Sequence, residues 1–311
     1  MLNLNLRKAN SGGKSNREAW LDIAKCFAIT LVVLNHMNIN IPIVTFFGGM
    51  FYMPVFFVAA GYTYRNKGEC FWKFAWSKAK RLLLPYAVCN LLLFGLFTVL
   101  NGGFSKSAFV GMFYSRSMLM AADSTWNMAL MPYLNAPTWF LTCIFLCLCI
   151  YFLIDRKFTE AKKRRMAVAA AVACGIAMRT LSPVLLPWSL ENALYFLGLL
   201  ELGRFLKEGG LAWLRNNQWI YANFFLVFVT LALMNGSVNV SISQYGRSMT
   251  VYVLVGGLGS LLCMKAAELT EKYVKIFVRL LSFIGRHTMP ILCWHLLAIE
   301  LMGKVLLAMG I

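Results

Sequence analysis

The sequence predicts an all-α, polytopic integral membrane protein: a helical bundle with about nine or ten transmembrane helices. Of its 311 residues, 60% are hydrophobic and 14% are charged, whereas soluble domains average about 45–50% apolar and about 25% charged residues. The apolar residues form long runs, such as 88–100 and 139–154, and with their flanks several approach the roughly 20 residues that cross a bilayer. The runs lack the two-residue alternation of a transmembrane barrel. They therefore exclude an ordinary soluble enzyme and a disordered chain.

Nine mainly apolar segments are expected to span the membrane. In chain order they are about 20–40, 44–64, 82–100, 138–155, 167–186, 189–206, 218–234, 249–267 and 287–309. The first follows a basic tail, and the third begins directly after a basic cluster. Arg179 and Pro183 interrupt the fifth. A tenth crossing is expected if 273–284 inserts into the membrane. The other possibility is a broken membrane helix within the longest non-spanning segment, 101–137.

The net charge of +18 indicates membrane topology rather than a nucleic-acid partner. Twenty-four of the 30 Lys and Arg residues lie in alternate segments between the apolar runs: 7–17, 65–81, 156–165, 204–215 and 265–286. Basic loops of multispanning proteins stay on the cytoplasmic side. We therefore expect a cytoplasmic N-terminal tail (1–18) and a single membrane domain (19–311) in the cell membrane. With nine spans the C-terminus lies outside, and a tenth would return it to the cytoplasm.

The nine cysteines do not indicate a metal site or a disulfide framework. Eight of them lie in apolar runs: Cys26, Cys89, Cys143, Cys147, Cys149, Cys174, Cys263 and Cys293. Buried free cysteine behaves as a small hydrophobic residue. No CxxC pair stands near a histidine, so we expect no bound metal.

The first span carries three ionisable residues, Asp22, Lys25 and His36. Such groups are costly inside a membrane, so each is a functional candidate. Lys25 and His36 are eleven residues apart, which puts them on one helix face about 16 Å apart along the axis. Asp22 lies on that face too, close enough to pair with Lys25. In the alternative interpretation, Lys25 reaches to the lipid headgroups and His36 sits at the outer interface.

Other polar residues near the spans have structural alternatives. Among the remaining histidines, His287 is expected at the interface, whereas His295 lies deeper in the last span and is either buried or catalytic. Glu191 begins a span and is expected to meet external water. Glu201 is expected to form a structural ion pair with Arg204.

Three further features complete the set of candidates. Glu300 has Lys304 four residues later, a spacing that supports the helix. Lys78, Lys80 and Arg81 precede the third span as an anchor on the cytoplasmic side. The same three cations could bind the phosphates of a polyanionic ligand, and Arg offers bidentate recognition.

Six patches resemble the acyltransferase-3 family of integral membrane acyltransferases. The segment WLDIAKCFAITLVVLNH (20–36) is similar to that family's first span, whose signature is a basic residue, ten residues and a histidine. The other five patches, in the family's order, are FFGGMFYMPVFFVAAGYTYR (46–65), KAKRLLLPY (78–86), PTWFL (137–141), LYFLGLLELGRFLK (194–207) and IGRHTMPILCWHLL (284–297). Most members have Arg at the position of Lys25. A lysine at this position is similar to the fucose 4-O-acetylase-like branch of the family. Lysine keeps the charge but loses the bidentate fork.

The resemblance implies a membrane-bound O-acyltransferase, most often an acetyltransferase, that moves an acyl group from cytoplasmic acetyl-CoA or another acyl-CoA to a hydroxyl of an envelope glycan or lipid-linked sugar. We expect Lys25 and His36 to act in catalysis, and our hypothesis is that Lys25, Lys78, Lys80 and Arg81 hold the coenzyme phosphates at the cytoplasmic face. Imidazole can act as base or as acyl acceptor near neutral pH. Side chains that support the reaction or hold the acceptor are expected among Asp22, Trp139, Glu191 and His295.

The competing hypothesis is a transporter or exporter. Lys25, His36 and Glu300 would then form a proton or substrate pathway through the membrane. The sequence contains no detectable internal repeat, which weighs against a transporter, as does the family resemblance.

Overall fold

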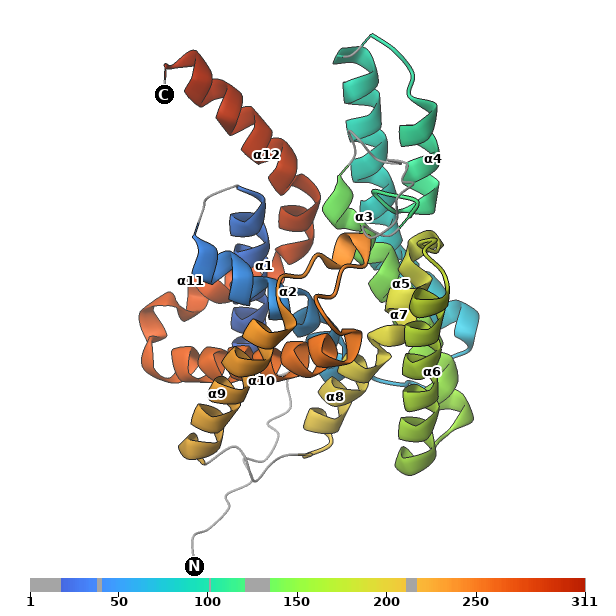
Figure 1. Cartoon of the computed structure of the whole chain (residues 1–311), viewed down its shortest axis with the longest axis vertical. Helices are drawn as coiled ribbons and strands as arrows, with labels where there is room; N and C mark the ends of the chain where they lie inside the picture. The colour runs from blue at the N-terminus through green and yellow to red at the C-terminus, as the bar shows by residue number, and fades with distance from the viewer. Residues whose placement is uncertain (1–17, 38–40, 101, 121–134, 211–216, 311) are drawn as a thin grey trace, which may run out of the picture.

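The computed structural model describes residues 18–37, 41–100, 102–120, 135–210 and 217–310, and the described part is almost entirely helical (Figure 1). It contains two isolated β-bridges but no strand in these ranges. Its helices are α1 (Ala19–His36), α2 (Pro42–Thr63), α3 (Phe71–Leu100), α4 (Lys106–Tyr114), η1 (Ala136–Thr138), α5 (Trp139–Lys157), α6 (Ala161–Leu181), η2 (Pro187–Ser189), α7 (Leu190–Tyr195), α8 (Leu197–Lys207), α9 (Gln218–Asn235), η4 (Val240–Ile242), α10 (Met249–Tyr273), α11 (Lys275–Arg286) and α12 (Thr288–Ala308). The predicted all-α membrane bundle is confirmed.

Six of the helices in the described part are long and apolar enough to cross a membrane: α1, α2, α3, the α5 segment, α10 and α12. The other three expected spans are also helical but differ in kind. Helix α6 begins with the charged residues Lys162, Lys163, Arg164 and Arg165, and the apolar part of α9 is only Trp219–Asn235. The span expected over 189–206 is interrupted at Phe196, which separates α7 from α8.

Two boundaries differ from the sequence prediction. Helix α3 begins at Phe71, so the basic cluster of Lys78, Lys80 and Arg81 lies inside the helix and not before it. Residues 275–286 form the separate helix α11, which at 12 residues is about 18 Å long and too short to cross a bilayer core of about 30 Å. A tenth crossing at this place is therefore wrong. Within 102–137, where a broken helix was considered, the described residues contain the short helix α4 and η1, and 121–134 lie outside the described residues.

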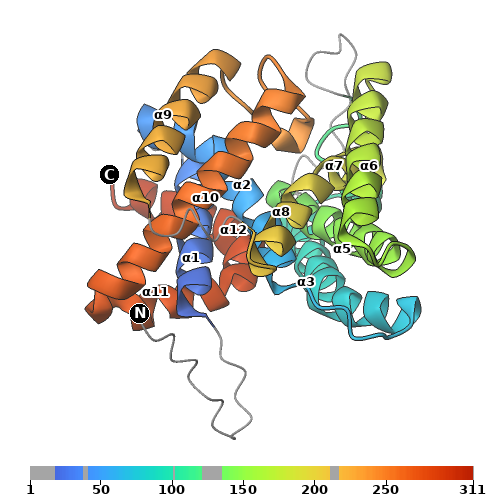
Figure 2. The ribbon, with the colours of Figure 1, turned by 90° about the horizontal axis from the view of Figure 1, so that it is seen from below.

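Helix α2 is the centre of the packing, because it contacts α1, α8 and α10, and Figure 2 shows it among them. Glycines permit the closest approaches. A Cβ on Gly61 of α2 would overlap the Leu200 carbonyl of α8, and a Cβ on Gly203 of α8 would overlap the Val58 carbonyl of α2. Small residues at such crossings let two backbones touch, which is how helices associate in a membrane.

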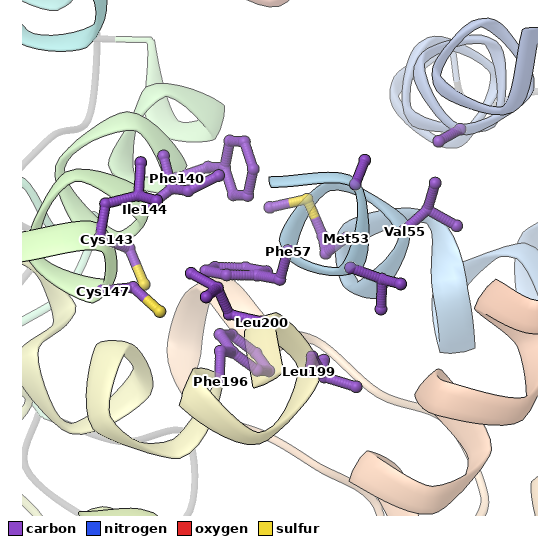
Figure 3. Close-up of a cluster of buried hydrophobic side chains, with 14 of the residues drawn as sticks. Met53, Val55, Phe57, Phe140, Cys143, Ile144, Cys147, Phe196, Leu199 and Leu200 are labelled. Atoms are coloured by element: carbon purple, nitrogen blue, oxygen red, sulfur yellow. The ribbon is translucent and has the colours of Figure 1, made fainter. Parts of the chain in front are cut away.

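The core lies where α2, α5 and the α7–α8 corner meet (Figure 3). Phe57 packs against Phe196 with ring centroids 4.5 Å apart and against Phe140 at 5.4 Å. Cys143 and Cys147 are buried beside them. Seven of the eight cysteines expected in the core are buried, but Cys174 is exposed on α6. This core holds α2 against α5, and both helices line the candidate site.

Candidate active site

A cavity of about 190 Å³ opens between α1, α2, α3, α5 and α12. Lys25, Lys78 and Arg81 line one end of it. The rest of its wall is mainly apolar, with Ile29 and Val32 from α1 and with Met53, Phe56, Phe140, Ile144, Met289 and Leu292 from the other helices. A cavity with a cationic end and an apolar wall fits a ligand whose anionic head continues into a less polar chain.

The basic end contains more positive than negative charge. Lys25 Nζ donates to Asp22 Oδ1 at 2.6 Å, which confirms the pairing expected from their spacing. Lys78 Nζ lies 5.0 Å from the centre of the Phe74 ring. Neither Lys78 nor Arg81 forms an ion pair with any residue in the described part of the chain. Two cations therefore face the cavity in addition to the Asp22–Lys25 pair.

Lys80 does not join this group. It is exposed, and its Nζ lies 5.2 Å from the centre of the Trp76 ring. Residues 78 and 81 are three apart and share a helix face, whereas residue 80 points to another side of the same helix. The structure thus separates one of the three cations that were expected to act together.

Two histidines lie one turn beyond the inner end of the cavity. His36 follows Val32 by four residues, and His295 follows Leu292 by three. Their rings are in contact, with centroids 5.0 Å apart and planes inclined by 67°. The α1 face predicted to carry Lys25 and His36 therefore runs along the cavity, and α12 adds a second imidazole from the far end of the sequence.

Hydrogen bonds determine which nitrogen of each histidine is free to react. His36 Nδ1 lies 2.7 Å from the Val32 carbonyl oxygen, and His295 Nδ1 lies 3.0 Å from the Leu292 carbonyl oxygen. A carbonyl only accepts, so each Nδ1 carries a hydrogen, and in the neutral imidazole each Nε2 then has a lone pair. His295 is buried, and its Nε2 has no hydrogen-bond partner among the described residues. The pair therefore offers two basic nitrogens for chemistry.

His287 and Trp139 lie outside this arrangement. His287 is exposed at the junction of α11 and α12, with its Nδ1 on the Phe283 carbonyl, as an interfacial residue would be. Trp139 is buried at the start of α5, next to Phe140 and Leu141, which line the cavity. Trp139 itself is not part of the lining, so it supports the wall from behind.

Glu191 does not meet water, contrary to the sequence prediction. Its side chain is 2% exposed and forms an ion pair with Arg116, which is itself fully buried. Arg116 also donates to the hydroxyls of Ser189 and Ser243. Arg116 and Glu191 are 75 residues apart in the sequence, and only the fold brings them together. Since neither residue lines the cavity, this pair holds the polypeptide together.

Glu300 also lies away from the cavity. Its carboxylate is 43% exposed and pairs with Lys304 Nζ at 2.9 Å, the contact expected from their spacing. No residue that lines the cavity contributes to this pair. The pathway of Lys25, His36 and Glu300 required by a transporter is therefore not continuous in the described structure.

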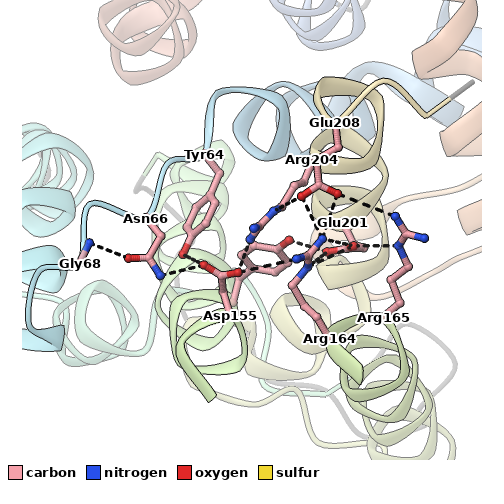
Figure 4. A network of polar contacts seen from close by, with 10 residues as sticks. Tyr64, Asn66, Gly68, Asp155, Arg164, Arg165, Glu201, Arg204 and Glu208 are labelled. Carbon is pink, nitrogen blue, oxygen red and sulfur yellow. Dashed lines mark hydrogen bonds and ion pairs between the residues drawn. The ribbon is translucent and has the colours of Figure 1, made fainter. Parts of the chain in front are cut away.

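A second group of charges holds α5, α6 and α8 together beside the cavity mouth (Figure 4). Glu201 pairs with Arg164 and Arg165 rather than with Arg204, which the sequence suggested as its partner. Arg204 instead binds Asp155 and Glu208. We name the six residues Asp155, Arg164, Arg165, Glu201, Arg204 and Glu208 the neutral network, because three carboxylates match three guanidinium groups.

Tyr64 connects the neutral network to the cavity. It lines the cavity mouth, and its hydroxyl donates to Asp155 Oδ2 at 3.1 Å. Burial, together with the Asp155 carboxylate, raises the pKa of the Tyr64 phenol, which therefore stays protonated at neutral pH. The sequence interpretation missed Asp155 and Arg164, because Asp155 is the last residue of an expected span and Arg164 falls in a basic segment that looks solvated.

In the described part of the chain, no group of three His, Cys, Asp or Glu side chains could hold a metal ion. The fold and the cavity thus define a multi-pass membrane protein with an internal cavity that is basic at one end and has a pair of imidazoles one helical turn beyond its apolar wall. The acyltransferase-3 model, whose description is "acyltransferase domain", matches residues 18–310, so the chain belongs to this family of membrane acyltransferases. The family generally transfers acyl groups to hydroxyls. No curated protein and no solved structure matches the chain.

Proposed function

We propose that the protein is an acyl-CoA-dependent O-acyltransferase that modifies a hydroxyl of an envelope glycan or lipid-linked sugar. Acetyl-CoA is the donor that we expect. The observation that carries this proposal is the cavity itself, which is lined by Lys25, Lys78 and Arg81 and extends along α1 to Val32, one helical turn before the His36–His295 pair. The Lys25 motif supports membership of the fucose 4-O-acetylase-like branch.

In the proposed complex, the coenzyme phosphates lie against Lys78, Arg81 and Lys25. The pantetheine arm follows the apolar wall along α1. The eleven residues from Lys25 to His36 cover about 16 Å of helix axis, a length comparable with that arm. The thioester then reaches the imidazoles while the charged head stays at the membrane surface. This division avoids placing phosphate charge inside the hydrocarbon region.

Two routes of acyl transfer fit the histidine pair. In the direct route, His36 Nε2 removes the acceptor hydroxyl proton as the oxygen attacks the thioester carbonyl carbon. The C–S bond then breaks, and the thiolate takes the proton from His36. In the two-step route, His36 Nε2 first accepts the acyl group and releases the thiolate. His295 then removes the hydroxyl proton as the oxygen takes the acyl group from His36.

The decisive test uses purified protein in liposomes with acetyl-CoA labelled in its acetyl group and an envelope glycan as acceptor. We expect label to move to the glycan. His36→Ala should abolish this transfer, a loss of at least about 100-fold, with coenzyme affinity largely retained. Full transfer by folded His36→Ala would refute the mechanism. Flux of a solute with no transfer by the parent protein would favour a transporter.

The two routes are separated by incubating the protein with labelled acetyl-CoA and no acceptor. The two-step route predicts one acetyl group on His36, found by mass spectrometry, and its accumulation in His295→Ala. The direct route predicts no labelled histidine in either protein. If the parent protein transfers acetyl to the acceptor but no label is found on any of its histidines, the acyl-histidine intermediate is excluded.

We further propose a cell-membrane location with a cytoplasmic N-terminus, because basic segments alternate along the chain. Single cysteines at Lys67 and at Ser237, both exposed, would be placed in a chain without native cysteines. A membrane-impermeant thiol reagent should label Ser237→Cys but not Lys67→Cys in intact cells. The reverse pattern would invert the topology and with it the side from which the coenzyme enters.

A further inference from the structure

Helix α11 (Lys275–Arg286) presents three different faces. Its inner face carries Val278, Leu281, Ser282 and Gly285, which pack against the core or are buried. Gly285 makes the closest contact, because a Cβ at this position would overlap the Asp22 carbonyl of α1. The backbone of α11 therefore touches α1 at the residue that pairs with Lys25.

The outer face of α11 is apolar and uncovered by other described residues. Ile276, Phe277, Leu280 and Phe283 are 83%, 53%, 55% and 54% exposed. At about 100° per residue, 276, 280 and 283 fall on one stripe roughly opposite the inner face. A soluble helix with one face on the protein would place polar residues here, so this stripe needs an apolar neighbour.

A third stripe is basic. Lys275, Arg279 and Arg286 are four and seven residues apart, so they share one side, located between the inner and the outer face. None of them forms an ion pair with a carboxylate of the described chain. Arg286 Nε donates only to the Ser282 carbonyl, at 3.1 Å. The stripe is thus available to anions along the whole helix.

The position of α11 suggests what covers it. It joins α10 to α12, two helices long and apolar enough to cross the membrane, and its about 18 Å length is too short to cross. It also contacts the N-terminal end of α1, which is the end predicted to be cytoplasmic. Apolar and basic stripes side by side are typical of a helix lying in the plane of a membrane surface.

We propose that α11 binds the anionic cytoplasmic leaflet, with the outer face among the acyl chains and the basic stripe on phospholipid phosphates. Through the Gly285–Asp22 contact, this lipid also positions the Asp22–Lys25 pair at the basic end of the cavity. The positioning of the Asp22–Lys25 pair rests on the proposed function, whereas the binding of α11 to the leaflet does not.

The first test measures depth and requires no catalysis. An environment-sensitive fluorophore is attached at Ile276→Cys, Arg279→Cys or Lys67→Cys, each in a chain without native cysteines, in nanodiscs containing phosphatidylglycerol. Lipids carrying a quencher in the acyl chain should quench the label at 276 most, and headgroup quenchers the label at 279. The control at 67 should be the least affected. Equal quenching at 276 and 67, or crosslinks between two copies through 276, would overturn membrane binding by α11.

The second test measures acetyl-CoA affinity in nanodiscs with and without phosphatidylglycerol. Lys275→Gln/Arg279→Gln should lose the tightening by anionic lipid that the parent retains, by about five-fold for each basic residue. Lys157→Gln removes an exposed cation from α5 and should keep the parent's response. Equal lipid dependence in the double variant and the parent would overturn the positioning role and leave the depth result intact. Absence of acetyl-CoA binding in every lipid would overturn the proposed function and, with it, this positioning role.

Discussion

The neutral network and the basic end of the cavity are both groups of charged side chains, and Tyr64 touches both, but they differ in charge balance. In the neutral network three carboxylates meet three guanidinium groups. At the cavity, of Lys25, Lys78 and Arg81 only Lys25 forms an ion pair with a described carboxylate, that of Asp22. A balanced and mostly buried group satisfies itself and fixes helices, whereas cations without a carboxylate partner at a cavity can bind an anion from outside. The comparison therefore distinguishes a structural cluster from a ligand-binding one.

The largest expected effect tests the structural side of the comparison. Glu201→Gln removes one carboxylate partner of buried Arg164, which keeps its pair with Glu208, so the cost should approach but not exceed the about 3–5 kcal/mol of a fully broken buried pair. We expect a clear fall in Tm, measured in detergent, with unchanged acetyl-CoA affinity in the protein that remains folded. A variant that keeps its Tm but loses affinity would show that the network serves the ligand.

The next effect tests the ligand-binding side. Arg81→Ala removes a cation that has no described carboxylate partner, so Tm should stay within the range of the parent. Hydrogen bonds to charged groups contribute about 1.5–3 kcal/mol, or roughly ten- to a hundredfold in affinity. Titration with acetyl-CoA should show this weakening. Parent-like affinity in a well-folded variant would remove Arg81 from the coenzyme site.

A smaller effect is expected at Lys25. This cation lines the cavity, but like the cations of the neutral network it already has a carboxylate partner, Asp22 at 2.6 Å. Lys25→Ala should weaken acetyl-CoA binding several-fold before it slows the chemical step. Lys25→Arg should be tolerated in part, since the charge remains. The measurement is KM for acetyl-CoA and kcat for each variant, and the change in KM is compared with the change in kcat. A loss of kcat alone in Lys25→Ala would assign Lys25 to the chemistry.

The smallest effect is expected at Lys80, the matched control for Arg81 on the same helix. Its side chain is exposed over Trp76 and does not line the cavity. Lys80→Ala should leave acetyl-CoA affinity within about twofold of the parent, as for most exposed charges. A tenfold loss would mean that the whole cluster, and not one helix face, binds the coenzyme.

Helical periodicity was sufficient for several features of the candidate site. The eleven-residue spacing placed Lys25 and His36 on one face, and the three- and four-residue spacings predicted the Asp22–Lys25 and Glu300–Lys304 pairs that the structure contains. These are contacts within one helix, where the geometry is fixed by the backbone alone. The family resemblance, confirmed over 18–310, connected these features to acyl transfer.

Contacts between helices could not be predicted in the same way. Arg116 and Glu191 are 75 residues apart and meet only because the fold encloses both. His295 reaches His36 through the packing of α12 on α1, which no local pattern encodes. The sequence interpretation grouped Lys80 with Lys78 and Arg81 because the three cations are close in sequence. All three lie within helix α3, which places Lys80 on a different face.

The backbone contact between α2 and α8 determines which parts of the molecule can move. Gly61 and Gly203 bring these helices together with no side chain between them, so one cannot shift past the other without steric overlap. The cavity is also lined by α3 and α12, whose C-terminal halves stand apart from the bundle in Figure 1. Admission of a bulky nucleotide should therefore occur as a hinge at these two helices against a rigid α2–α8 body. Spin-label distances between α3 and α12 should change when acetyl-CoA binds, and those between α2 and α8 should not.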